Sequence, residues 1–164
     1  SLLLHKIHKK LGRSPDDVQA TPRRDAPLPE AEVVYRERLA EIAAVARERG
    51  ARVAFITQRI RFAADHPIAP ADSVSAFRWL PYLTVDGMIT GMARYNEITR
   101  AVGESLGVPV ADVASGLTVG DADFADYCHW TDAGARKMGE FVASVLPDSL
   151  FADVTDAGAR QGRD

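Results

Sequence analysis

The feature of this sequence that most constrains its fold is an apolar segment that follows directly on an amphipathic helix. Residues 52–57 read Arg-Val-Ala-Phe-Ile-Thr, with no polar residue inside the run. A helix is predicted before it, because Pro29 and Glu30 suit a first turn and Gly50 suits a stop. An uninterrupted apolar run at this position is typical of a strand buried on both faces of a parallel sheet. The predicted inward side chains of the helix are Tyr35, Leu39, Ile42 and Ala46.

The same order of elements recurs further along the chain. A helix is predicted over residues 88–106, with Gly107 as its stop, and residues 108–113 form a second strand. A last helix, 132–146, begins after Thr131, whose hydroxyl is well placed to cap it. This alternation predicts an α/β fold, a three-layer α/β/α flavodoxin-like arrangement around a parallel sheet. The predicted inward side chains are Met92, Tyr95, Ile98, Thr99, Val102 and Leu106 in the first helix and Ala135, Met138, Phe141, Val142 and Val145 in the second.

Two strands are too few for the helices that the sequence predicts. Sheets in globular proteins typically contain about five or six strands, and two cannot cover three or four amphipathic helices. We therefore expect the sheet to be incomplete at the N-terminus, with further strands preceding Ser1; the alternative is that strands are hidden in the loops. On this view residues 1–147 are the C-terminal portion of a single domain, and residues 148–164 are a polar C-terminal tail.

The remaining segments carry weaker signals. Residues 1–12 are predicted to form a short helix, and residues 13–29 a proline-rich loop. Residues 58–87 contain three prolines and show no regular apolar spacing, so they are predicted to be irregular. Loops of that length in compact domains are uncommon unless they serve binding. The segment is therefore either a substrate-side insertion or a surface excursion.

Charge and composition exclude several classes of partner. The formal net charge is -3 at pH 7, so no strong positive field is available to hold a nucleic acid. The longest apolar runs fall far short of the roughly 20 residues that span a bilayer, so no transmembrane segment is expected. The single cysteine, Cys128, excludes an internal disulfide and any site built from several cysteines. Compartment and oligomeric state are not encoded in any feature of the sequence.

The residues most suited to chemistry are Asp126 and His129, in the loop between the second strand and the last helix. Loops at the carboxyl ends of parallel strands are where ligands bind in such folds. An acid three residues before a histidine can place its carboxylate on one imidazole nitrogen. That contact fixes the tautomer and stabilises the imidazolium that forms when the other nitrogen removes a proton from a nucleophile.

This segment resembles the last sequence block of the SGNH (GDSL) hydrolase family. Residues 126–129 read Asp-Tyr-Cys-His, and residues 131–134 read Thr-Asp-Ala-Gly, which resembles the family's Asp-x-x-His and the helix start that follows. The elements over residues 30–146 are similar to those that these enzymes place around the block. The resemblance implies that His129 is the general base of a Ser-His-Asp triad and Asp126 its orienting acid, with no metal or organic cofactor.

The chain departs from the family pattern in the residues that should attack and stabilise the substrate. The family's nucleophile lies in a Gly-Asp-Ser block near the N-terminus, whereas residues 120–123 here read Gly-Asp-Ala-Asp and lie near the other end. The only asparagine, Asn96, falls inside a predicted helix, so the family's Gly-x-Asn-Asp motif is absent. The missing blocks normally precede the matched region, which agrees with the expectation of an incomplete N-terminus.

The function expected from this resemblance is the C-terminal part of a serine-dependent ester hydrolase, inactive in isolation because the nucleophile is missing. Its substrate would be a small-molecule, lipid or carbohydrate ester. Two alternatives remain open: a non-catalytic relative that binds acyl or carbohydrate groups, and an unrelated flavodoxin-like binding or signalling module.

Other interpretations of the same loop were also open. Asp121, Asp123 and Asp126 could form a cation site with His129, since closely spaced carboxylates suit hard ions. Cys128 could be taken for a nucleophile activated by His129, but neighbours in an extended loop point apart, which favours a packing role. Three aromatic residues could line a substrate pocket or belong to the core. They are Trp79, Tyr82 and Trp130.

Overall fold

The computed structural model describes residues 22–62 and 70–151 of the chain. The predicted helix 1–12 and most of the tail 148–164 lie outside these residues, and the domain boundary at residue 147 stays a prediction. The elements are, in order, α3 (Pro29–Glu48), β1 (Phe55–Ile56), α4 (Pro70–Trp79), α5 (Val85–Leu106), β2 (Val110–Ala111), α6 (Val113–Gly116) and α7 (Asp132–Val145), with short 3-10 turns at Asp121–Asp123 and Asp148–Leu150.

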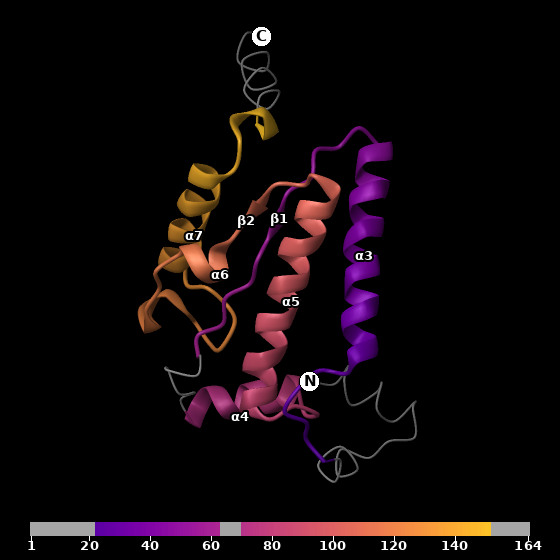
Figure 1. The fold of residues 1–164 in the computed structure, drawn as a ribbon. Helices are drawn as coiled ribbons and strands as arrows, with labels where there is room; N and C mark the ends of the chain where they lie inside the picture. Colours follow the sequence, from indigo (N-terminus) through magenta and orange to yellow (C-terminus); the bar gives the residue numbers. More distant parts are fainter. Residues whose placement is uncertain (1–21, 63–69, 152–164) are drawn as a thin grey trace.

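The two predicted strands pair with each other. β1 and β2 run parallel, with Phe55 opposite Val110 and Ile56 opposite Ala111. The amides of Phe55 and Thr57 donate to the carbonyls of Pro109 and Ala111 over 2.9 and 3.1 Å. Helices α3 and α5 lie together on one side of the strands, and α7 lies on the other (Figure 1). The α/β class is thus present, with a two-stranded parallel sheet in the part of the chain that the structure describes.

The main apolar core lies between the strands and the pair α3–α5. Its buried members are Ala43, Phe55, Ile98, Val102 and Val108. Three residues predicted to face inward on α5 are buried as expected, namely Ile98, Thr99 and Val102. On α3, however, Ile42 is 58% exposed, which makes its predicted inward position wrong. Ala43, four residues after Leu39, is buried instead, in the same cluster against which Tyr35 and Leu39 pack as predicted.

Both long helices show the expected end signals. Gly50 and Gly107, which follow α3 and α5, adopt φ angles of 70° and 60°, a conformation that glycine takes without steric cost. The start of α5 was predicted at residue 88, but the helix begins at Val85. The hydroxyl of Thr84 accepts a 3.0 Å hydrogen bond from the Gly87 amide, and this cap sets the earlier start.

Residues 58–87 are not irregular throughout, contrary to the prediction. They contain α4 (Pro70–Trp79), whose proline start and acidic Asp72 repeat the signals that open α3. A second apolar cluster anchors this region, with Phe62, Ala76, Met88 and Tyr127 buried together. It connects the segment after β1, α4 and α5 to the loop before α7.

Helix α7 has the predicted cap but not the predicted burial. The Thr131 hydroxyl accepts a 3.1 Å hydrogen bond from the Gly134 amide. Val145 is 46% exposed and Ala135 is exposed as well, so the predicted inward stripe is wrong at these two positions.

On the strands, Ile56 is 48% exposed although burial on both faces was expected. Side chains alternate along a strand, so the face opposite Phe55 is only partly covered by the described residues.

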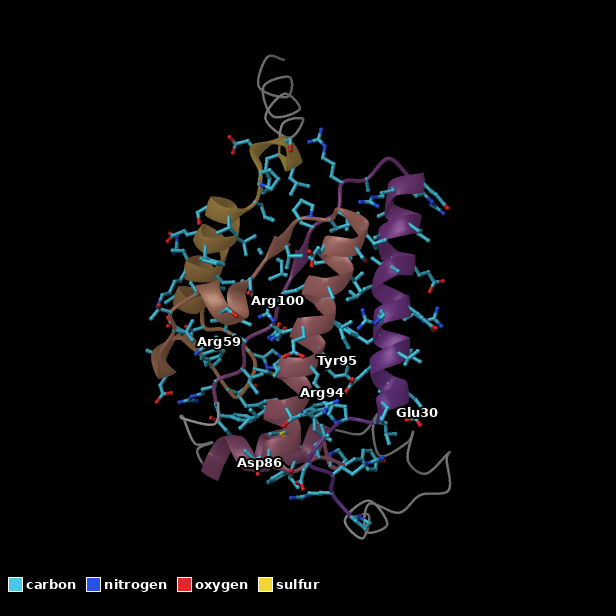
Figure 2. The ribbon with its side chains drawn as sticks, in the orientation of Figure 1. Glu30, Arg59, Asp86, Arg94, Tyr95 and Arg100 are labelled. Atoms are coloured by element: carbon cyan, nitrogen blue, oxygen red, sulfur yellow. The ribbon has the colours of Figure 1, made fainter. Side chains whose placement is uncertain are left out.

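Arginines on α5 point to both sides of the helix. Arg94 lies toward α3, where its Nη1 is 2.9 Å from the Glu32 carboxylate, whereas Arg100 lies toward the strands (Figure 2). None of the helices within the described ranges is long and apolar enough to cross a membrane.

Candidate active site

The structure brings Asp126 and His129 into direct contact. Asp126 Oδ2 lies 2.8 Å from His129 Nδ1, and Asp126 Oδ1 accepts the backbone amide of His129, also over 2.8 Å. The amide of Cys128 donates to the same Oδ1 over 2.9 Å. One carboxylate therefore bonds two loop amides and the ring, which sets both the loop conformation and the direction of the imidazole. The His129 side chain is 74% exposed, so the ring is otherwise open to solvent.

These contacts keep Asp126 ionised. Burial favours the protonated acid, but the Cys128 amide, the His129 ring and the His129 amide together outweigh burial and lower the pKa of Asp126 to about 2. The carboxylate consequently carries its charge throughout the neutral range. A charged acceptor on Nδ1 favours the tautomer with its proton on that nitrogen, which leaves the Nε2 lone pair free.

The loop that carries the pair is closed at its base by a short antiparallel contact. Phe124 and Trp130 form an isolated bridge, and their rings stack with centroids 4.5 Å apart. Inside this base, the Ala125 amide donates to the His129 carbonyl over 2.8 Å. The aromatic side chain of Trp130 thus supports the loop from within, and the pocket role considered for it finds no support in this geometry.

Gly134 explains why the loop can lie so close to α7. A Cβ at this position would come within 2.1 Å of the Asp123 carbonyl oxygen. That same carbonyl accepts the Thr131 amide over 2.9 Å. The glycine of the Thr-x-x-Gly pattern is therefore needed for contact between the helix and the loop.

A second set of contacts holds the loop at the carboxyl end of β1. Tyr127, which lies between Asp126 and Cys128, is buried, and its carbonyl accepts the Arg61 amide over 2.9 Å. Its ring packs near Phe62, with centroids 6.5 Å apart. Burial is the main cause that raises the pKa of Tyr127 to about 12. The Asp126–His129 pair is thus placed beyond the carboxyl end of a parallel strand, where the sequence predicted it.

Cys128 lies nearer to the ring than predicted. Its Sγ is 3.6 Å from His129 Nδ1, so the two neighbouring side chains do not point apart. The turn imposed by Asp126 is tighter than an extended loop and brings them together. Burial raises the pKa of the Cys128 thiol, and Nδ1 already contacts the Asp126 carboxylate. Both effects disfavour a thiolate nucleophile at this position.

The three acids of the loop do not form the cation site that was considered. Asp123 Oδ2 accepts from the Gly120 amide and from Lys137 Nζ, over 2.8 and 3.1 Å. Asp121 pairs with Arg61, whose Nε lies 3.4 Å from its carboxylate. Each acid is directed to a different partner, and Asp126 alone faces His129.

The structure also contains a polar network that sequence reasoning missed. The Asp112 carboxylate accepts from Thr57 over 2.7 Å and from Arg100 Nε over 2.9 Å, and Arg100 continues to Ser115 over 2.9 Å. The hydrogen bonds from Arg100 are the main cause that lowers the pKa of Asp112. Only the placement of Asp112 after a strand could have indicated this network from the sequence.

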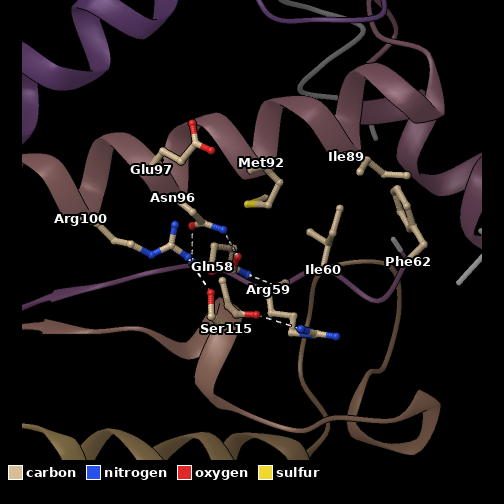
Figure 3. A pocket seen from close by; sticks show the side chains of 12 residues that line it. Gln58, Arg59, Ile60, Phe62, Ile89, Met92, Asn96, Glu97, Arg100 and Ser115 are labelled. Atoms are coloured by element: carbon tan, nitrogen blue, oxygen red, sulfur yellow. Dashed lines mark hydrogen bonds between the residues drawn. The ribbon is translucent and has the colours of Figure 1, made fainter. Parts of the chain in front are cut away.

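Beside this network lies a cavity of about 270 Å³ between α5, α6 and the segment that follows β1 (Figure 3). Asn96 lies in α5, inside a helix as predicted, and its side chain is buried. It accepts the Gln58 amide over 2.8 Å and donates to the Gln58 carbonyl over 2.7 Å. These two hydrogen bonds fix the backbone just after the carboxyl end of β1. The cavity is lined by no residue of the loop 120–131, so we treat it as separate from the Asp126–His129 pair.

Comparisons with protein-family models, with curated proteins and with solved structures found no match for this chain.

Proposed function

We propose that this chain supplies the acid–base pair of a serine-dependent ester hydrolase, as the C-terminal part of its catalytic domain. The observation that carries the proposal is the 2.8 Å contact between the Asp126 carboxylate and His129 Nδ1, with the rest of the ring open to solvent. The contact meets the geometric requirement for a base held in one tautomer by a charged acid.

In the proposed reaction, His129 Nε2 removes the proton from a serine hydroxyl as its oxygen attacks the ester carbonyl carbon. Asp126 stabilises the imidazolium, which then gives the proton to the departing alcohol and leaves an acyl-serine. Water repeats the same steps and releases the acid. Among the residues that the structure describes, no hydroxyl group hydrogen-bonds to the His129 ring. The proposal therefore places the serine, and the donors that stabilise the oxyanion, outside the residues that the structure describes.

The three-layer flavodoxin-like sheet belongs to the same proposal. It is supported by helices on both sides of a parallel strand pair (Figure 1) and by the half-exposed side chain of Ile56, the second residue of β1. In a parallel strand, backbone groups alternate between the two edges. Because Phe55 and Thr57 bond to β2, the backbone groups of Ile56 face the other edge, where a further strand would pair.

The test uses the complete gene product and p-nitrophenyl acetate. We expect His129→Ala to lower kcat/KM by roughly 10³-fold or more, the scale of losses when one triad member is removed. Arg136→Ala, which removes an exposed side chain from α7, is the matched control and should retain the wild-type rate. Labelling with a fluorophosphonate, followed by peptide mass spectrometry, would locate the serine. Equal rates for wild type and His129→Ala would contradict the proposal.

A further inference from the structure

The loop of the proposed active site holds three different metal-ligand types within reach of one another. Carboxylate, thiol and imidazole ligand atoms of Asp126, Cys128 and His129 all lie within 4.8 Å. We propose that these three residues bind a thiophilic divalent cation, Zn²⁺ being the clearest case, and that the bound ion switches off the acid–base pair. The second half of this inference rests on the proposed function, and the first half does not.

Two of the three donor separations are close to those in a zinc coordination sphere, and the third is at most 4.8 Å. Typical zinc bonds of about 2.3 Å to sulfur and about 2.0–2.2 Å to nitrogen or oxygen place tetrahedral ligand atoms about 3.4–3.6 Å apart. Cys128 Sγ and His129 Nδ1 are already 3.6 Å apart. Asp126 Oδ2 and Nδ1 are 2.8 Å apart, so admitting the ion requires these two atoms to separate by well under one ångström.

The donor set selects the class of ion. A thiol and an imidazole with a single carboxylate suit zinc and similar borderline or soft cations, whereas Mg²⁺ and Ca²⁺ need six or more oxygen ligands. The exposed side of His129 leaves room for a water as fourth ligand. The amides of Cys128 and His129 hold Asp126 Oδ1, and such outer contacts keep a ligating carboxylate oriented.

Binding would change the protonation of two of the three side chains, Cys128 and His129. The Cys128 thiol loses its proton to solvent when sulfur bonds to the ion. Nδ1 must offer a lone pair, so the neutral imidazole carries its proton on Nε2 instead. An Nε2 that holds a proton cannot accept one from serine, and the Asp126 carboxylate now faces the cation. The ion and the acid–base role of His129 are therefore mutually exclusive.

The first test measures binding on the full 164-residue chain without any catalysis. Zn²⁺ affinity is determined by competition with a chromogenic chelator, and Cd²⁺ serves as a spectroscopic probe, because a cadmium–thiolate bond adds a charge-transfer band in the ultraviolet. The chain contains one cysteine, so that band reports Cys128 alone. We expect the band in the wild type and roughly a 10- to 100-fold or greater loss of Zn²⁺ affinity in Cys128→Ser. Mg²⁺ should not compete.

The other histidines require a background control. His5, His8 and His66 are also present in the chain, so the measurement is repeated in a His5→Ala/His8→Ala/His66→Ala variant. In this triple variant, the Zn²⁺ affinity and its loss on Cys128→Ser should be the same as in the wild type. Wild-type affinity in Cys128→Ser, or no cadmium–thiolate band in the wild type, would overturn the metal site.

The second test concerns the switch and uses the complete gene product. Zn²⁺ should inhibit p-nitrophenyl acetate hydrolysis and a chelator should reverse this inhibition. In Cys128→Ser, the rate with Zn²⁺ should equal that variant's own rate without the ion. If the chain binds Zn²⁺ through Cys128 but the wild-type enzyme hydrolyses the ester equally well with Zn²⁺ bound, the switch is wrong and the metal site stands. If Zn²⁺ binds and no His129-dependent hydrolysis exists, the proposed function fails by itself.

Discussion

On the side of the strands that faces α3 and α5, the described residues form an apolar core, whereas on the side of α7 they form a polar loop and a half-covered helix. Val102, in the first region, is 3% exposed, and Val145, in the second, is 46% exposed. The first region is held by burial of apolar surface. The second combines local aromatic contacts, such as the stacked Phe124 and Trp130 rings, with hydrogen bonds and with close backbone contacts such as that at Gly134.

Within this small structure, one region mainly stabilises the fold and the other mainly orients the groups of the proposed site. Apolar burial stabilises a fold without specifying the direction of any polar group. Hydrogen bonds to a charged group are directional, and they aim the imidazole of His129. We therefore expect changes on the α5 side to act on the free energy of unfolding and changes in the loop to act on the site.

The largest effect on stability is expected from Val102→Ala, compared with Val145→Ala. Both replacements remove the same atoms from a helix, so any change in helix propensity is shared. Loss of buried atoms and the resulting cavity should lower the free energy of unfolding by about 2–3 kcal/mol at Val102, against about 0.5 kcal/mol or less at Val145. Urea denaturation measures both. Equal losses would show that the α7 side is as well packed as the core.

The next effect compares two glycines of α7, Gly134 and Gly139. Alanine at Gly139 has nothing within 4 Å and should stabilise the helix by about 0.5–1 kcal/mol. Alanine at Gly134 would meet the Asp123 carbonyl at 2.1 Å, and the forced displacement should cost roughly 1–3 kcal/mol. Thermal denaturation of both variants gives the difference. Stabilisation of similar size by both would mean that the loop does not rest on α7.

The sequence predicted those parts of the molecule that depend on local patterns. Helices α3, α5 and α7 follow from apolar spacing and end signals, and the contact between Asp126 and His129 follows from a spacing of three residues in a turn. The catalytic role of the pair stays a prediction. The sequence prediction missed α4 because prolines such as those in residues 58–87 usually indicate loops, although Pro70 occupies the first helical position.

What could not be predicted depends on contacts between distant segments. The Thr57–Asp112 hydrogen bond, the buried amide of Asn96 against Gln58 and the anchoring of Tyr127 by Arg61 each join residues more than 35 positions apart. No periodicity encodes them. The proximity of Cys128 to the ring was mispredicted for another reason, since the two amides on Asp126 tighten the loop into a turn.

The smallest expected effect is the dependence of stability on pH. The pKa of Asp126 is about 2 in the folded chain, below its ordinary value of 3.8, so the unfolded chain binds the proton more readily. The stabilisation is complete above about pH 5 and is lost as the pH falls through the folded value near 2. Solvent screening keeps it small, because the carboxylate is 35% exposed. Acid titration of wild type and Asp126→Asn should give curves that converge toward pH 2. A constant difference down to that pH would contradict the assignment.

If the Asp126 carboxylate holds His129 with its proton on Nδ1, the tautomer of the ring should reveal it. Nitrogen-15 NMR of the imidazoles at neutral pH, with His129 assigned by its absence in His129→Gln, distinguishes the two neutral tautomers. We expect a protonated Nδ1 and a bare Nε2 in the wild type, with a shift toward the Nε2-protonated form in Asp126→Asn. A wild-type ring already protonated mainly on Nε2, unchanged by that substitution, would contradict it.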